Sequence, residues 1–159
     1  MDGHARPHVV ILGGGFGGLW ATRALRNAPV RVTLIDRANH HVFQPLLYQV
    51  AAASLSGPDI SARLRHIVRR QDNVTVLMEE VQTIDVAAPC VRSEADEYEY
   101  DWLIVATGST HAYFGHDDWA GHAPGLKTMD DALAIRRRVL SAFEAAERQP
   151  DPARRAQGL

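Results

Sequence analysis

Cysteine is almost absent from this sequence of 159 residues, which contains only Cys90. A single cysteine excludes an internal disulfide, a CxxC redox pair and any zinc cluster built from cysteines. The sequence also lacks a surplus of one charge, because 17 basic and 19 acidic residues give a net charge of -2 at pH 7. We therefore expect no nucleic-acid partner and no general attraction to anionic lipid, and the composition fits a reducing cytoplasm.

Long apolar runs are missing as well. The run Val9–Leu12 ends after four residues at a series of glycines, which is too short for a signal-peptide core or a membrane span. Apolar residues make up 46% of the sequence and charged residues 23%, as in ordinary soluble domains. The sequence predicts one globular domain that is neither secreted nor membrane-spanning.

The first third of the chain predicts a strand, a tight turn, a helix and a second strand. Val9–Leu12 is β-branched and continuously apolar, which is typical of a strand buried on both faces of a parallel sheet. Helical spacing starts at Gly17 and stops near Pro29, and residues 30–35 form a second apolar strand that ends at Asp36. This βαβ unit predicts a Rossmann-like, doubly wound α/β fold.

Apolar patterns predict further elements along the rest of the chain. We expect a long loop over 39–57, a helix over about 58–70 and a strand over 74–78. A small antiparallel meander follows, with strands over 81–86, near Val91 and over 97–100, and then a strand over 102–106. The chain is expected to end with a helix from Thr128 to Pro150, whose start has capping-box spacing to Asp131, and a linker over 150–159. The strand over 102–106 is expected to return to the central sheet.

The motif Gly13-x-Gly15-x-x-Gly18 lies between the first strand and the helix. Glycine at the first position permits the sharp turn, the second lets a pyrophosphate approach the backbone, and the third lets the helix pack closely. A glycine-rich turn without a ligand is the alternative interpretation. The flanking strand and helix, together with a distal acid, favour a dinucleotide site at the helix N-terminus.

That acid is Asp36, 18 residues beyond Gly18, at the end of the second strand. A carboxylate in this place can accept both hydroxyls of an adenosine ribose and repels a 2'-phosphate, so NADP is not expected here. The alternative is an aspartate that only caps a loop. Arg37 can stack on adenine, neutralise phosphate or lie in solvent, and the sequence leaves these possibilities open.

Three histidines at positions 111, 116 and 122, with two aspartates between them, raise the alternative of a metal site. They lack i, i+4 spacing and a cysteine partner, so we interpret them as loop histidines and predict no metal.

With these residues in place, the sequence resembles the flavoproteins that have two dinucleotide-binding domains. More narrowly, it resembles the type II, non-proton-pumping NADH:quinone oxidoreductases. The general resemblance lies in the segment VVILGGGFGG, which contains Gly13, Gly14, Gly15, Phe16, Gly17 and Gly18, in Asp36, and in YDWLIVATGS at 100–109. The narrower resemblance lies in HVFQPLLYQVA at 41–51.

The resemblance implies FAD as the cofactor and assigns residues to it. It implies that Gln44 and Pro45 border the isoalloxazine ring, that Val81 meets adenine through its backbone, and that Ala106, Thr107 and Gly108 close on the cofactor. It also implies an FAD-binding domain over 1–127, followed over 128–159 by a helix and linker toward an NADH-binding domain.

The implied activity is transfer of electrons from NADH through FAD to a quinone. Relatives of this kind continue with an NADH-binding domain and with helices that attach them to the inner face of the cell membrane. We expect the 159-residue chain to be a truncated form without these parts and inactive alone. No residue is predicted to be a catalytic acid or base.

Two other interpretations stay open. One is the FAD domain of a related ferredoxin, rubredoxin or sulfide reductase, although the segment after Asp36 and the single cysteine disfavour it. The other is a non-catalytic dinucleotide-binding module or gene remnant.

Overall fold

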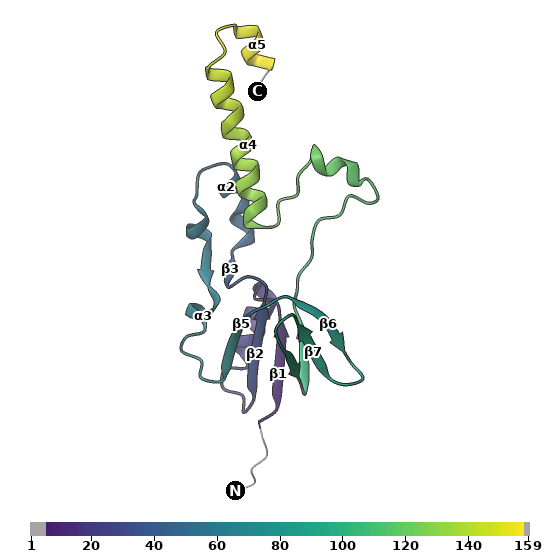
Figure 1. Ribbon diagram of the computed structural model, residues 1–159. Coiled ribbons are helices and arrows are strands. Elements are labelled where there is room, and N and C mark those ends of the chain that lie inside the picture. The colour runs from purple at the N-terminus through teal and green to yellow at the C-terminus, as the bar shows by residue number, and fades with distance from the viewer. Residues whose placement is uncertain (1–5, 158–159) are drawn as a thin grey trace. The chain divides into compact units, whose positions relative to one another are not determined.

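A computed structural model describes residues 6–157 of the chain (Figure 1), which divide into two compact units. The first unit combines the residues up to His41 with Ala62–Ser109, and the second combines Val42–Ser61 with the residues from Thr110 onward. The chain thus leaves the first unit twice, each time into the second.

A parallel sheet of four strands forms the centre of the first unit. The strands are β1 (His8–Leu12), β2 (Arg31–Asp36), β5 (Val74–Met78) and β9 (Trp102–Val105), in the order β5-β2-β1-β9 (Figure 1). β1 pairs with β2 on one side and with β9 on the other, all in parallel. The predicted parallel sheet, including the return of the strand near residue 105, is confirmed.

Helix α1 (Phe16–Ala24) connects β1 to β2 and ends earlier than expected. The side-chain amide of Asn73 donates to the carbonyl oxygens of Leu25 at 3.0 Å and Ala28 at 3.3 Å. Because a distant side chain satisfies these carbonyls, the chain beyond Ala24 has no need of further helical turns. Sequence periodicity does not reveal such a partner.

Side chains of β1 alternate between two apolar clusters, one on each face of the sheet. On one face, α1 and the segment around Leu64 contribute to a cluster of Val9, Ile11, Leu19, Val32, Leu34, Leu64, Val68 and Val76. On the other face, the cluster consists of Val10, Leu12, Ile35 and Val91, with Tyr98 and Tyr100 packed against it. The sheet is therefore buried on both faces, as the continuous apolar run of β1 predicts.

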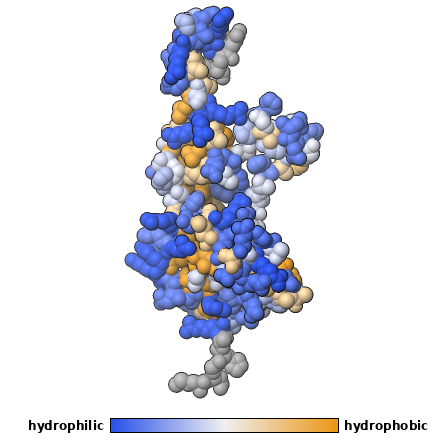
Figure 2. Space-filling model, viewed as in Figure 1, coloured by the Kyte–Doolittle hydropathy of each residue, from blue (hydrophilic) through white to orange (hydrophobic). Residues whose placement is uncertain are grey.

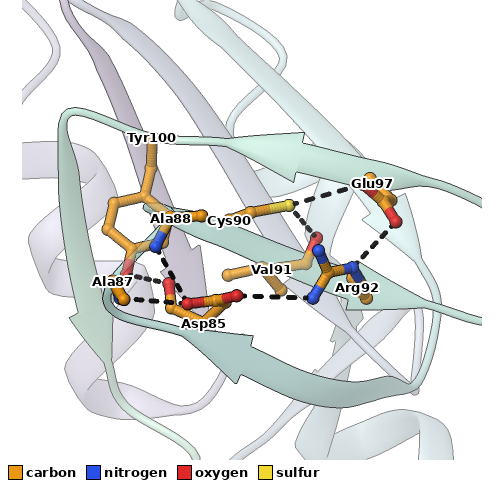
Figure 3. Close-up of polar contacts among 8 residues, drawn as sticks. All are labelled: Asp85, Ala87, Ala88, Cys90, Val91, Arg92, Glu97 and Tyr100. Atoms are coloured by element: carbon orange, nitrogen blue, oxygen red, sulfur yellow. Dashed lines mark hydrogen bonds and ion pairs between the residues drawn. The ribbon is translucent and has the colours of Figure 1, made fainter.

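The second face is covered by the predicted antiparallel meander of β6 (Val81–Asp85), β7 (Cys90–Ser93) and β8 (Glu97–Glu99). Figure 3 shows the polar contacts that connect the strands and turn of this meander. The Asp85 carboxylate accepts the amide N–H groups of Ala87 and Ala88 at 3.0 and 2.9 Å. Arg92 donates to Glu97 at 2.8 Å. Backbone hydrogen bonding at Ala88, ahead of Ala87 and Arg92, lowers the pKa of Asp85.

The second unit is built on α2 (Leu47–Ala51) and α4 (Met129–Glu147), which share a buried cluster. Its buried members are Leu47, Val50, Ala51, Ile60 and Ala132. The predicted capping box is confirmed: the Asp131 amide donates to the Thr128 hydroxyl at 3.1 Å, and the Thr128 amide donates to the Asp131 carboxylate at 2.8 Å. Burial raises the pKa of the Asp131 carboxyl, but the hydrogen bonds that this group accepts from the amides of Lys127 and Thr128 outweigh burial, so the pKa is lowered.

The far half of α4 carries large apolar side chains that are exposed, namely Val139, Leu140 and Phe143. Apolar surface over α4 is visible in the upper part of Figure 2. Among the described residues, no helix is both long enough and apolar enough to cross a membrane. The second unit thus has a smaller core than the first, with large apolar side chains exposed on α4.

Two sequence predictions between residues 39 and 70 are wrong. The expected loop over 39–57 contains β3 (His40–Val42), the 3-10 helix η1 (Gln44–Leu46) and α2. The expected helix over 58–70 is instead η2 (Gly57–Ile60), β4 (Ser61–Arg63) and α3 (Leu64–Ile67).

The physical reason is pairing between segments that are distant in sequence. β4 pairs with β3, and at the ends of this pair Phe43 N–H donates to Ile60 O at 2.8 Å and Leu64 N–H to Asn39 O at 2.9 Å. These bonds take the backbone groups that a continuous helix needs.

Two shorter helices complete the described chain. Residues 117–121 form the 3-10 helix η3 (Asp117–Gly121), and the tail expected as a linker contains α5 (Pro152–Gln157). The guanidinium of Arg155 donates to the Gln149 carbonyl at 2.9 Å, which fixes the entry into α5.

Candidate functional site

The turn between β1 and α1 requires glycine at its first position. Gly13 donates its N–H to the Ile35 carbonyl at 2.8 Å and has a φ of +99°, a conformation that favours glycine. A Cβ added to Gly13 would overlap the carbonyl oxygen of Ala106. The turn is therefore held between β2 and the end of β9.

Two more glycines permit close packing behind the turn. A Cβ at Gly18 would overlap the carbonyl oxygen of Gly13, and one at Gly14 would lie 2.5 Å from Cδ1 of Leu64. Both glycines are buried. The backbone of α1 can therefore approach the end of β1 at a distance that any side chain would prevent.

Gly15 and Gly17, in contrast, are exposed. A Cβ at Gly15 would meet nothing within 4 Å among the described residues. Gly15 is the N-cap of α1 and makes no side-chain hydrogen bond to the start of this helix. The first N–H groups of a helix have no acceptor inside it and form its positive end, so this open edge suits an anionic ligand.

Asp36 ends β2 beside the turn. Its carboxylate accepts the Gly14 N–H and, at 2.7 Å, the Ala38 N–H. An ionised carboxylate offers about four acceptor positions, so about two of them stay available to a ligand. Arg37, the next residue, is exposed.

A cavity of about 260 Å³ lies next to this turn, and the first unit alone forms it. Its lining residues are Leu12, Gly13, Ile35, Asp36, Arg37, Glu79, Glu80, Val81 and Thr107. Five of the predicted site residues are therefore brought together around one cavity, from the ends of four different strands. The carboxyl ends of parallel strands are where α/β sheets bind ligands.

Glu79 and Glu80 belong to this cavity and were missed by the sequence analysis. Their position directly after β5 is the signal that could have found them. The hydroxyl groups of Tyr98 and Ser93 donate to the Glu79 carboxylate at 2.7 and 2.6 Å. Burial, with the neighbouring Glu79 carboxylate, raises the pKa of Tyr98 to about 12.

The segment after β9 closes against the glycine turn. The Ala106 N–H donates to the Leu12 carbonyl at 2.8 Å, and the Ala106 Cβ would lie 3.6 Å from a Cβ at Gly17. Thr107 and Gly108 follow as exposed residues, with a φ of +77° at Gly108. Ala106 and Thr107 are thus at the edge of the same site, and the predicted role of Gly108 stays a prediction.

Gln44 and Pro45 lie in the second unit, where they begin η1 as exposed residues. Their predicted contact with a flavin ring stays a prediction.

Two of the loop histidines contact aromatic rings. His111 meets Tyr113 edge to face, and His116 stacks on Trp119 with ring centroids 4.4 Å apart. Across residues 6–157, no three His, Cys, Asp or Glu side chains are grouped as a metal ion would require.

A second cavity, of about 570 Å³, lies at the opposite, amino end of the strands, lined in part by His8, Arg31 and Cys90. Some of its polar groups bond one another: the His8 ring lies 2.6 Å from the Glu99 carbonyl, and Arg92 donates to Glu97 at 2.8 Å. The glycine turn offers backbone N–H groups at the start of α1 beside open space, so we place the candidate site there.

Comparisons with known proteins show to which family the chain belongs. The pyridine nucleotide-disulphide oxidoreductase family matches residues 7–148. The type II NADH:quinone oxidoreductase Ndh of Mycobacterium tuberculosis is 52% identical over 97% of this chain and 34% of its own length. The Staphylococcus aureus type II enzyme is 27% identical over 92% of this chain and 38% of its own length. The chain thus spans about a third of the length of the curated relatives that it matches.

Solved structures show the same fold. NDH2 of Plasmodium falciparum in complex with NADH has a TM-score of 0.78 at 26% identity, over 91% of this chain and 31% of that one. The sulfide:quinone oxidoreductase of Aquifex aeolicus has a TM-score of 0.77 at 27% identity, over 87% of this chain and 32% of that one. The chain belongs to the pyridine nucleotide-disulphide oxidoreductase family and is a homologue of the type II NADH:quinone oxidoreductases, as its sequence predicts.

Proposed function

We propose that this chain is the FAD-binding part of an NADH:quinone oxidoreductase, and that its first unit holds the adenosine and diphosphate of FAD. The observation that carries the proposal is the glycine turn with Asp36 beside it, which together offer donors to a phosphate and acceptors to a ribose. The family match and the relatives' names support the same cofactor and activity.

The residues present fit the adenosine diphosphate half of FAD. We assign the diphosphate to the open edge at Gly15 and Gly17, where backbone N–H groups begin α1 and no Cβ fills the space. We assign the ribose hydroxyls to the remaining acceptor positions of Asp36. The adenine then occupies the cavity near Val81 and Arg37.

The charge of the cavity supports a dinucleotide without a 2'-phosphate. Asp36, Glu79 and Glu80 line it, against Arg37. Three carboxylates that line one cavity repel an additional phosphate, since like charges at short range disfavour binding.

When bound, FAD supplies the hydride and electron transfer itself, and the protein supplies binding and orientation. In this proposal the described residues bind and orient the cofactor, and none of them acts as a general acid or base. Gln44 and Pro45 border the flavin ring, and NADH and quinone are substrates of the whole enzyme.

Another member of the family with a different acceptor is the second candidate, favoured by the similarity to a sulfide:quinone oxidoreductase. Dithiol chemistry would need a cysteine pair. The single Cys90 is buried in β7, at the cavity opposite the glycine turn, which disfavours this candidate.

Replacement of Asp36 tests the proposal. We expect the purified chain to bind FAD, measured by quenching of flavin fluorescence, and D36N to weaken binding about ten- to a hundredfold, because a charged hydrogen-bond acceptor contributes roughly 1.5–3 kcal/mol. D72N removes an exposed carboxylate outside the cavity and is the matched control. The proposal fails if the unmodified chain does not bind FAD, or if D36N and D72N bind it equally.

A further inference from the structure

Two side chains hold Gly14 in place, one on each of its backbone polar groups. The Asp36 carboxylate accepts its N–H, and Nδ1 of His41 lies 3.1 Å from its carbonyl oxygen. Since a carbonyl oxygen can only accept, Nδ1 carries the proton and donates it. Asp36 thus restrains the Gly13–Gly14 peptide group, and His41 restrains the Gly14–Gly15 peptide group.

The second restraint determines the direction of the Gly15 N–H. In a planar trans peptide group, the carbonyl oxygen and the following N–H point to opposite sides. His41 binds the Gly14 carbonyl, which belongs to a buried residue, so the N–H of Gly15 is directed away from His41. Gly15 itself is exposed, and the space beside it is open to a ligand.

Such a restraint is needed because the turn contains three consecutive glycines. Glycine populates positive and negative φ about equally, so a peptide group between two glycines can rotate at little cost. Rotation by about half a turn would replace the donor at the open edge by a carbonyl oxygen, which repels phosphate.

The position of His41 is itself fixed by packing. Its ring meets the ring of Phe16 edge to face, with centroids 4.9 Å apart and an interplanar angle of 89°. It belongs to β3, which follows Asn39, and the Asn39 carbonyl accepts the Leu64 N–H. Leu64 in turn packs against Gly14. The ring of Phe16 and the backbone hydrogen bond between Leu64 and Asn39 therefore hold His41 beside the turn.

We propose that His41 is a positioning residue, which orients the Gly15 N–H toward the diphosphate of the cofactor by donating from Nδ1 to the Gly14 carbonyl. This inference rests on the proposed function, since it concerns the same site. It adds a residue outside the glycine motif and Asp36 that determines how tightly a diphosphate binds.

Two variants separate the hydrogen bond from the ring contact. H41F keeps an aromatic ring against Phe16 and loses the donor, while H41N loses the ring and keeps an N–H near the position of Nδ1. H40N changes the exposed neighbouring histidine and is the matched control.

We expect H41F to bind ADP and FAD about five- to tenfold more weakly, the effect of one lost hydrogen bond, with H41N within about twofold of the unmodified chain. Adenosine lacks the phosphates, so its affinity should be unchanged in all variants. A merely structural role of His41 would instead weaken adenosine and ADP together.

A measurement without ligand tests the same inference independently. In ¹⁵N-labelled protein, H41F should shift or broaden the Gly15 amide resonance, whereas H41N and H40N should leave it in place. If the unmodified chain binds neither FAD nor ADP, the proposed function fails, and the Gly15 resonance alone decides the role of His41. The inference is wrong if H41F leaves that resonance and the ADP affinity unchanged, or if H41N is as defective as H41F.

Discussion

The two units differ in what they bury and in which part of the family resemblance they contain. The first has apolar clusters on both faces of a parallel sheet, and the second has one cluster between α2 and α4. The glycine motif and Asp36, which are general to dinucleotide-binding proteins, lie in the first unit. Most of the segment 41–51, which carries the narrower resemblance, lies in the second. The residues of the general dinucleotide motif and most residues of the narrower resemblance therefore lie in units with separate cores.

The largest effect on this comparison is expected from G18V. A side chain at Gly18 would overlap the Gly13 carbonyl, and backbone cannot move aside as a flexible side chain can. Overpacking of this kind costs about 3 kcal/mol, so the unfolding free energy of the first unit should fall by that amount. Urea unfolding measures it, with hydrogen exchange of β1 amides to identify the unit.

The matched variant is G15A, whose added methyl group has open space. Its unfolding free energy should stay within about 0.5 kcal/mol of the unmodified chain. Equal destabilisation by both variants would show that the close approach of α1 to β1 contributes nothing specific.

The second effect concerns pH and the buried His8 of the first unit. Burial is the main cause that lowers its pKa below the ordinary 6.5. The unfolded chain therefore takes up a proton near pH 6.5, whereas the folded chain does so only at lower pH. The contribution to stability is complete above pH 6.5 and declines as the pH falls below it.

The H8Q variant should lose about 1–2 kcal/mol at pH 7.5, from disrupted hydrogen bonds to Thr33 and Glu99. Its unfolding free energy should also depend less steeply on pH between 7.5 and 5. H66Q, at an exposed histidine, should keep the slope of the unmodified chain. If H8Q keeps that slope too, His8 is not the titrating group.

The smallest effect is expected in the second unit, from T128A. This variant removes the hydroxyl that accepts the Asp131 N–H at the start of α4. Loss of such a cap costs about 1 kcal/mol. Hydrogen exchange of α4 amides should become faster while exchange in β1 and β2 is unchanged. Faster exchange in the sheet as well would show that the two cores unfold together.

The sequence correctly predicted those features that depend on a local pattern of residues. Val9–Leu12 is buried on both faces, the Thr128 capping box forms, and the spacing from Gly18 to Asp36 brings the acid to the turn. The prediction was wrong where the secondary structure depends on pairing with a segment that is distant in sequence. Ser61–Arg63 pairs with β3 in place of continuing a helix, and no periodicity reveals that partner.

The candidate site likewise contains some residues that the sequence pattern predicts and others that it does not. The glycines and Asp36 have a spacing that can be counted, so they could be predicted. Glu79 and His41 reach the turn or its cavity through strand ends whose neighbours are known only once the sheet is assembled. Their roles depend on tertiary contacts, which the sequence pattern does not encode.

The contact between Gly13 and Ala106 has a consequence for the order in which the protein is made. The glycine turn leaves the ribosome early, but it is enclosed by β2 and by the end of β9, whose residues are synthesised much later. Contacts between residues so distant in sequence form slowly in folding. Although its motif is near the start of the chain, the turn therefore acquires its final form only after β9 has been synthesised, and a cofactor can assist only the last steps of folding.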